Sequence, residues 1–238
     1  MTTENEQLVR DWLPDDPDLV AIVNRLMTAV TTAPEAVEPG EVSVIALITL
    51  TVQHAPRMIP QQVERALQNG VSARQLLETV YQLVPVVGLP KVQVALSAMH
   101  PYLPTPAKAE PMATADAGAA VQQQLYGTEI KTLLKDLPAN AGNDLPQWLT
   151  QHFFEDYYGR DGLTVAQRER YELMALITLN VDFQIKAHAR GSLKAGNSEE
   201  RLIWSALQLL PYVGFPLVIN SVQQIHAAAV TLRSQKEA

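Results

Sequence analysis

QQVERALQNGVSARQLLETVYQLVPVVGLP (residues 61–90) and AHARGSLKAGNSEERLIWSALQLLPYVGFP (residues 187–216) are two copies of one pattern within the chain. Their glycines and prolines keep one constant separation of 126 positions, in the pairs Gly70/Gly196, Pro85/Pro211, Gly88/Gly214 and Pro90/Pro216. Upstream, the run Ala46–Leu50 recurs as Ala175–Leu179 at a separation of 129 positions. The first copy therefore holds three extra residues, which we place within Ala55–Pro60. A pattern this long, with glycines and prolines in register, identifies an internal repeat.

Each copy is predicted to form successive helices joined at a helix-ending glycine. Gly70 occupies a position that favours a left-handed backbone after a helix, and Ser72 with Gln75 predicts a capping box for the next one. The predicted helices cover residues 18–30, 41–53, 59–69, 72–84 and 91–100, then 145–158, 164–180, 184–195, 198–210 and 216–233. The apolar segment 41–53 would also suit a strand, but its repeat partner is a better helix former. Since no stretch alternates with period two between hairpin turns, the fold class is all-α.

The repeat divides the chain into two similar units. We predict a diverged first repeat over residues 1–104, a stiff linker rich in proline and alanine over 105–121, and a second repeat over 122–238. The second repeat carries an additional predicted helix at 122–135. The polar residues 1–16 are expected to be frayed or to lie against a neighbouring chain.

Composition excludes several classes of function. The formal net charge is −7, so a phosphate backbone would be repelled and nucleic acid is not an expected partner. Apolar runs are too short to span a bilayer, and the N-terminus shows no signal peptide, which predicts a cytoplasmic protein. Charged residues make up only 18 %, which indicates that other copies cover part of the surface.

Absent cysteines exclude a second group of functions. With no cysteine, the chain has no disulfide, thiolate metal site, cysteine nucleophile or redox dithiol. The five histidines show neither HxxH nor HExxH spacing, so no metal site is predicted. No glycine-rich phosphate loop or serine-nucleophile elbow occurs. We therefore expect a protein without metal or cofactor.

An ordered set of short motifs resembles the carboxymuconolactone decarboxylase family, which includes the alkylhydroperoxidase D-like proteins. The motifs are YGTEIK from Tyr126, GRDGL from Gly159, Arg168, HARGSLKAG from His188 and YVGFP from Tyr212. The resemblance covers nearly all of residues 122–229 and, in diverged form, 18–100. It implies an all-helical fold of two repeats that form a pseudo-dimer within one chain. Because this family commonly forms rings of six domains, it further implies a trimer of two-repeat subunits, a pseudo-hexamer.

The resemblance also implies roles for residues of the second repeat. In the decarboxylase branch a histidine lies eight residues before the helix-ending glycine, and His188 occupies that position. In the peroxidase branch two cysteines accompany it; here those positions hold Gln184 and Val181, which removes thiol peroxidase chemistry. A glutamate nineteen residues before the histidine corresponds to Glu169. Gln184 is then a candidate substrate-binding residue.

The first repeat departs further from the family pattern. The position equivalent to His188 is Gln62, whose amide cannot exchange a proton near neutral pH. Glu78 resembles a glutamate of the family's third motif, whereas its partner in the second copy is Trp204. Each repeat thus keeps a different polar residue, and if the repeats alternate around a ring, one complete site is shared between them. Gln62 and Glu78 are candidate substrate-binding residues.

Further candidates carry open alternatives. Arg160, Arg168 and Arg190 are candidate clamps for a substrate carboxylate. The Tyr212 hydroxyl can donate to a carboxylate, although packing alone also explains a tyrosine there. If the two helices form a simple hairpin, Glu169 lies about 18 Å and Glu172 about 15 Å below the corner, against about 8 Å for His188. Either glutamate therefore remains a candidate partner of His188, and a solvated helix face remains the alternative for Glu169.

These observations predict a decarboxylase-like lyase. The expected reaction is acid–base decarboxylation or isomerisation of a small carboxylated lactone or keto acid, with His188 exchanging the proton. The alternative is a non-catalytic oligomeric protein that binds a small molecule on the same scaffold. A cavity lined only by apolar groups would favour that alternative.

Overall fold

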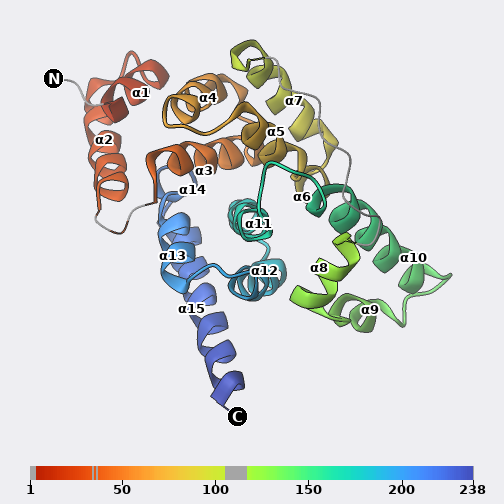
Figure 1. Cartoon of the computed structure of the whole chain (residues 1–238). Coiled ribbons are helices and arrows are strands. Elements are labelled where there is room, and N and C mark those ends of the chain that lie inside the picture. Colours follow the sequence, from red (N-terminus) through yellow and green to blue (C-terminus); the bar gives the residue numbers. More distant parts are fainter. Residues whose placement is uncertain (1–3, 34, 36, 105–116, 238) are drawn as a thin grey trace.

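In the computed structural model, the chain is a set of helices built around two central helices, one from each repeat (Figure 1). The structure describes residues 4–33, 35, 37–104 and 117–237. Helix α3 (Pro39–Val52) packs against α11 (Val165–Leu179), and most side chains of both are buried. Within the described ranges no residue forms a β-strand, so the all-α prediction is confirmed.

The first repeat follows the predicted order of helices. After α3 come α4 (Ile59–Gln68), α5 (Ala73–Tyr81), α6 (Val84–Val87) and α7 (Leu89–Met99). The predicted capping box is present, with the Ser72 hydroxyl accepting from the Gln75 amide. A single 3₁₀ turn, η1 (Pro56–Met58), lies between α3 and α4. This turn lies inside the segment predicted for the insertion.

The second repeat retains the same plan with different helix ends. Its α11 is followed by α12 (Asp182–Lys194), α13 (Glu199–Leu207), α14 (Leu210–Val213) and α15 (Phe215–Glu237). Thr164 caps α11 in a second capping box with Gln167. Asn180 adopts a left-handed backbone with a φ of 57° and turns the chain directly from α11 into α12. The short turn sets α12 beside the buried face of α11.

Additional helices cover one side of the second repeat. The predicted helix 122–135 is two helices, α8 (Ala117–Tyr126) and α9 (Glu129–Leu134), because Gly127 interrupts it with a φ of 58°. Residues 117–121 of the predicted linker belong to α8, and 105–116 lie outside the described residues. Helix α10 (Ala141–Trp148) runs into a wide π-helical segment, η3 (Leu149–Tyr158), which packs on α8.

The N-terminal segment differs from its prediction. Residues 4–12 form helix α1 (Glu4–Trp12), which packs on α2 (Pro17–Thr31). Leu8 and Val9 are buried against Val20 and Met27, so the helix has a small apolar core of its own. The expectation of a frayed segment is therefore wrong for residues 4–12. Three apolar positions among many polar ones gave too weak a pattern to reveal this helix.

Two buried ion clusters connect the repeats. Glu41 of α3 accepts from Arg170 of α11 and from Arg201 of α13. Glu78 of α5 is buried and accepts from three arginines, Arg74, Arg160 and Arg168. Because buried charges need such partners, these clusters fix the position of α11 against the first repeat. No helix of the described chain has the length and apolarity needed to cross a membrane.

Candidate functional site

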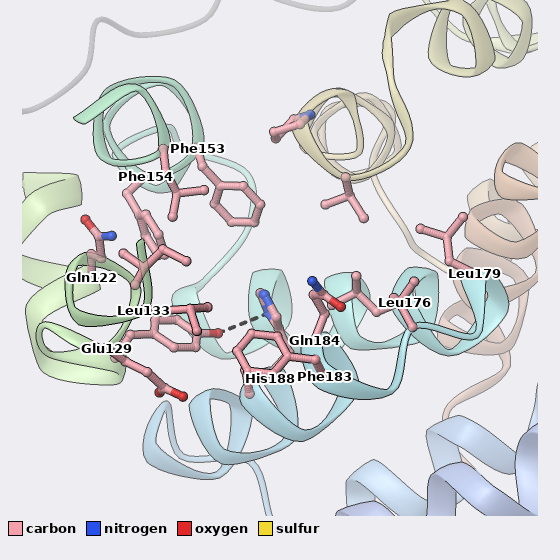
Figure 2. Close-up of a pocket in the computed structure, with 17 residues that line it drawn as sticks. Gln122, Glu129, Leu133, Phe153, Phe154, Leu176, Leu179, Phe183, Gln184 and His188 are labelled. Atoms are coloured by element: carbon pink, nitrogen blue, oxygen red, sulfur yellow. Dashed lines mark hydrogen bonds between the residues drawn. The ribbon is translucent and has the colours of Figure 1, made fainter. Parts of the chain in front are cut away.

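A cavity of about 380 Å³ lies where α8, α9, η3 and the first turns of α12 meet (Figure 2). The first repeat closes one side of it with Pro85 and Val86 of α6. Most of the wall is apolar, formed by residues such as Ile130, Leu133, Phe153, Phe154, Leu176 and Phe183. Polar side chains also line it, namely Gln122, Tyr126, Glu129, Gln184 and His188. The cavity is thus suited to a small molecule with a few polar groups.

His188 of α12 lies in the cavity wall and is held at one ring nitrogen. Its Nδ1 lies 3.0 Å from the Tyr126 hydroxyl, 3.4 Å from Glu169 Oε2 and 3.6 Å from Glu172 Oε2. No hydrogen bond within the described chain uses Nε2. One nitrogen therefore faces a buried acidic cluster, and the other is left for a ligand.

Two tyrosines connect the acidic cluster to the histidine. The Tyr126 hydroxyl donates to Glu169 Oε2. The Tyr158 hydroxyl lies 2.5 Å from Glu169 Oε1 and 2.9 Å from Glu172 Oε2. Both carboxylates are buried. The five side chains come from α8, η3, α11 and α12, so the site depends on how these four elements pack.

Counting protons assigns a direction to this chain of hydrogen bonds. A phenol has one proton, so Tyr126, which donates to Glu169, accepts at its oxygen from Nδ1–H of His188. This tautomer leaves a lone pair on Nε2. Tyr158 likewise has one proton for two carboxyl oxygens, so its second contact requires a proton on a carboxyl group. Glu172 is the better holder of that proton.

Burial supports this assignment. Burial first, and the neighbouring Glu169 charge second, raise the pKa of Glu172 well above its usual range. Burial is also the largest cause of the strongly raised pKa of both Tyr126 and Tyr158. The tyrosines therefore stay neutral donors, and Glu172 holds its proton at higher pH than an exposed glutamate would.

A glycine makes room for the contact between Tyr126 and Glu169. Gly191 lies on α12, and a Cβ there would fall 2.6 Å from Glu169 Oε2 and closer still to the Tyr126 hydroxyl. A real Cβ essentially never comes so close to another heavy atom. The absence of a side chain at Gly191 is therefore a condition for the hydrogen-bond chain.

Of the predicted site residues, three lie together. Glu169 and His188 are in ion-pair distance of each other, and Gln184 lines the cavity one turn before His188. Glu172 contacts His188 as well, so both candidate glutamates reach it. The hairpin estimate placed Glu169 too far away because helix rise measures only backbone height, whereas both side chains extend towards each other.

The other predicted residues lie elsewhere. Arg160 and Arg168 bind Glu78, and none of the three lines the cavity. Gln62 is buried in α4, and its Nε2 has no hydrogen-bond partner in the part of the chain that the structure describes.

Tyr212 faces a different part of the molecule. On α14 it packs edge-on against Trp12, at a ring distance of 6.3 Å, and lines a separate cavity of about 740 Å³. Burial raises its pKa. Neither the first cavity nor its acidic cluster contains this tyrosine.

Sequence reasoning missed Tyr126 and Tyr158 as site residues. Tyr126 opens one of the motifs that carry the family resemblance, which was the available signal. For Tyr158 no such signal exists, because its contact with Glu169 and Glu172 follows from the packing of η3 on the rest of the repeat. The spacing of histidines likewise could not show that donor atoms of Glu169, Glu172 and His188 lie within 4.8 Å of one another.

Comparison with known families now identifies the class. The carboxymuconolactone decarboxylase family matches the chain twice, at residues 17–101 and 143–227. The chain belongs to this family, in a tandem two-repeat form. None of the curated proteins matches it.

Proposed function

We propose that the protein catalyses a cofactor-independent decarboxylation or isomerisation of a small carboxylated lactone or keto acid. His188 is the acid–base residue and works at Nε2. The observation that carries this proposal is the hydrogen-bond chain behind His188: Nδ1 is engaged by Tyr126, and Glu169 lies behind Tyr126. Such an arrangement fixes the tautomer and favours the protonated ring during reaction.

Both reactions require the site to take up one proton and to return it. In a decarboxylation, Nε2 takes the proton of the substrate carboxylic acid, the electrons of the bond to the departing CO₂ remain on the substrate as an enolate, and the enolate carbon takes that proton back from Nε2–H. In an isomerisation, Nε2 removes a proton beside a carbonyl and returns it at another carbon. The imidazolium formed in either case is stabilised by the charge of Glu169 through Tyr126.

The cavity restricts the substrate. Its volume of about 380 Å³ and its apolar wall suit a small, mainly apolar molecule. The amides of Gln122 and Gln184 are available to carbonyl or carboxylate oxygens. Since Arg160 and Arg168 bind Glu78, the remaining candidate clamp is Arg190, which binds Glu129 at 2.9 Å. A substrate carboxylate would take the place of Glu129.

A non-catalytic binding protein is the second candidate. The largely apolar wall favours it, whereas the histidine and the buried acidic cluster favour an enzyme. The two candidates differ in what His188 does for turnover and for binding.

The test is a pH–rate profile with a carboxylated butenolide and with a β-keto acid as probes, following loss of substrate and release of CO₂. We expect a titrating limb in the wild type, and for His188→Gln a loss of about 10²- to 10⁴-fold in kcat. His152→Gln serves as control because His152 is exposed, pairs with Asp156 and does not line the cavity. Equal turnover of wild type and His188→Gln would refute the role of His188. Binding of the probes without turnover by the wild type would support the second candidate.

Self-association into a trimer and a cytoplasmic location are part of the proposal. Leu89 and Phe215 occupy equivalent positions at the starts of α7 and α15, and their exposed fractions are 63 % and 54 %. Paired apolar positions of this kind suit a ring in which the repeats alternate. Light scattering should give three times the chain mass of 26.2 kDa, and a mass of 26.2 kDa would refute the trimer. Cell fractionation tests the location.

A further inference from the structure

The acidic cluster behind His188 lacks the positive charge that the other buried carboxylates have. Glu41 contacts two arginines and Glu78 contacts three. Glu169 and Glu172 are as deeply buried, yet within the described residues neither has an arginine or lysine in ion-pair distance. Their shared ionic partner is His188. Two buried carboxylates need a proton or a cation between them.

Donor atoms of the cluster are arranged as a cation would need them. Nδ1 of His188 lies 3.4 Å from Glu169 Oε2 and 3.6 Å from Glu172 Oε2. All three atoms lie within 4.8 Å of one another. A cation with bonds of about 2.0–2.2 Å separates its ligand atoms by about 3–4 Å. The two distances from Nδ1 therefore match the edges of such a coordination shell.

A second observation is independent of these distances. Glu172 is fully buried, and its Oε1 has no hydrogen-bond partner among the described residues. Buried carboxylate oxygens are otherwise paired, as those of Glu41 and Glu78 are. The unpartnered oxygen belongs to the same carboxyl group that faces Nδ1 of His188. It leaves this group with an unused lone pair for a ligand.

We propose that Glu169, Glu172 and His188 bind a divalent transition-metal cation, which replaces the proton held between Glu172 and Tyr158 and the proton on Nδ1 of His188. One imidazole and two carboxylates suit Zn²⁺ or Mn²⁺ better than Mg²⁺, which prefers oxygen ligands and keeps its waters. The cation would reach the cluster from the cavity, since the His188 side chain borders it and is 14 % exposed. Cation and protons compete for the same atoms, so an occupied site would block the proton exchange. This inference goes beyond the proposed function and does not depend on it.

The test is calorimetric titration of chelator-treated protein with Zn²⁺ and with Mg²⁺, without substrate. We expect one saturable Zn²⁺ site and much weaker binding of Mg²⁺. Because the ligands must lose protons, the heat should change between buffers of different ionisation enthalpy. Glu172→Gln should weaken Zn²⁺ binding by at least about 10- to 100-fold, the range already seen for groups behind metal ligands.

Two controls distinguish Zn²⁺ binding at this cluster from Zn²⁺ binding by other carboxylates and histidines. Glu129→Gln removes a carboxylate at the cavity and should leave the affinity unchanged. The double variant His152→Gln/His226→Gln removes two exposed histidines that pair with carboxylates, and it should keep the tight site. If Glu172→Gln does not fold, as judged by circular dichroism, His188→Gln takes its place. Equal Zn²⁺ affinity of the variant and the wild type, or no saturable binding by the wild type, would overturn the proposal.

The outcome can be told apart from that of the proposed function. If the protein binds Zn²⁺ but turns over no probe, the proposed cation site stands and the proposed enzyme activity is refuted. If turnover depends on His188 but the protein shows no saturable Zn²⁺ binding, the proposed enzyme activity stands and the cation site is refuted. Zn²⁺ that binds and lowers turnover of the wild type supports both.

Discussion

The two repeats share one backbone plan but differ in what their equivalent positions carry. In the second repeat Glu169, Glu172 and His188 form the acidic cluster and its histidine. At the corresponding separations of 129 and 126 positions, the first repeat has Gly40, Ser43 and Gln62. A Cβ at Gly40 would fall 2.8 Å from Val71 and 3.0 Å from the Asn69 carbonyl oxygen. The first repeat has therefore filled with packed atoms the space from which a glutamate side chain would start.

The first repeat keeps an equivalent cavity although it lacks the acidic cluster and its histidine. Pro85, Val86, Gln184 and Ala187 line the first cavity, and their counterparts 126 positions away, Pro211, Tyr212, Met58 and Gln61, line the cavity near Trp12. Each cavity thus takes part of its wall from the other repeat. The difference teaches that the shared scaffold determines where a cavity forms, whereas a few positions on α11 and α12 determine whether a histidine and a buried acidic cluster lie beside it.

The first repeat also supports the second. Glu78 of α5 holds Arg168, the residue directly before Glu169, in a fully buried ion pair at 3.1 Å. The equivalent of Glu78 in the second repeat is Trp204, which carries no charge. The first repeat thus stabilises the helix that carries Glu169, and the second repeat carries the candidate site. Variants at equivalent positions of the two repeats can test this division.

The largest effect is expected for Glu78→Gln. This change leaves Arg168 buried with a neutral partner and removes the Glu78 charge from Arg160 and Arg74, of which Arg74 keeps Asp161 as a partner. Breaking a buried ion pair on one side costs about 3–5 kcal/mol. Urea denaturation should show this loss of unfolding free energy. The exposed Glu64→Gln on the same repeat serves as control and should stay within about 0.5 kcal/mol; an equally small effect of Glu78→Gln would refute the supporting role.

The order of the helices could be predicted from the sequence, since local signals set it. Glycines after helices, prolines in first turns and the capping box at Ser72 act within a few residues of themselves. The break at Gly127 and helix α1 could not be predicted in this way. Gly127 interrupts an otherwise helical pattern, and α1 is stabilised by contacts with α2 that its own sequence does not display.

The site could be predicted only in part. His188, Glu169 and Gln184 lie on one pair of consecutive helices, so the family resemblance and the spacing reached them. The two tyrosines come from α8 and η3, far away in sequence, and only tertiary packing brings them to Glu169. Nor could the sequence show that Arg160 and Arg168 bind a glutamate of the other repeat.

The next largest effect is expected for Gly191→Ala, which tests the hydrogen-bond chain behind His188. The new Cβ would displace the Tyr126 hydroxyl and Glu169 Oε2. We expect a loss of about 1–3 kcal/mol in stability, typical of overpacking, together with a changed pH–rate profile because His188 loses its partner. Gly40→Ala in the first repeat is the matched control: it also overlaps its neighbours, so it should lower stability and leave the pH–rate profile as it is. Equal profiles for wild type and Gly191→Ala would argue against the chain.

The dependence of stability on pH tests the proton on Glu172. Because burial raises the folded-state pKa of Glu172 above its unfolded value, its contribution is fully present below the unfolded pKa. It is lost as the pH rises through the folded pKa, with a slope of at most about 1.4 kcal/mol per pH unit for one proton. Glu172→Gln, neutral at every pH, should remove this slope. Urea denaturation in steps from pH 4 to pH 9 measures it, and identical slopes in both proteins would contradict the assignment.

The smallest effect is expected at Gln62, the counterpart of His188. Gln62 is 1 % exposed and its Nε2 has no hydrogen-bond partner within the described ranges, so an apolar side chain of similar size removes an unpaired donor. Gln62→Leu should therefore be neutral or stabilising by up to about 1 kcal/mol, because nothing that the amide bonded is left unpaired. His188→Leu at the equivalent position removes the partner of Tyr126 and should destabilise instead. Thermal denaturation of both variants measures the change in Tm of each. Equal shifts in Tm would show that Gln62 still has a polar role. Shifts of opposite sign are expected if position 62 takes no part in proton exchange.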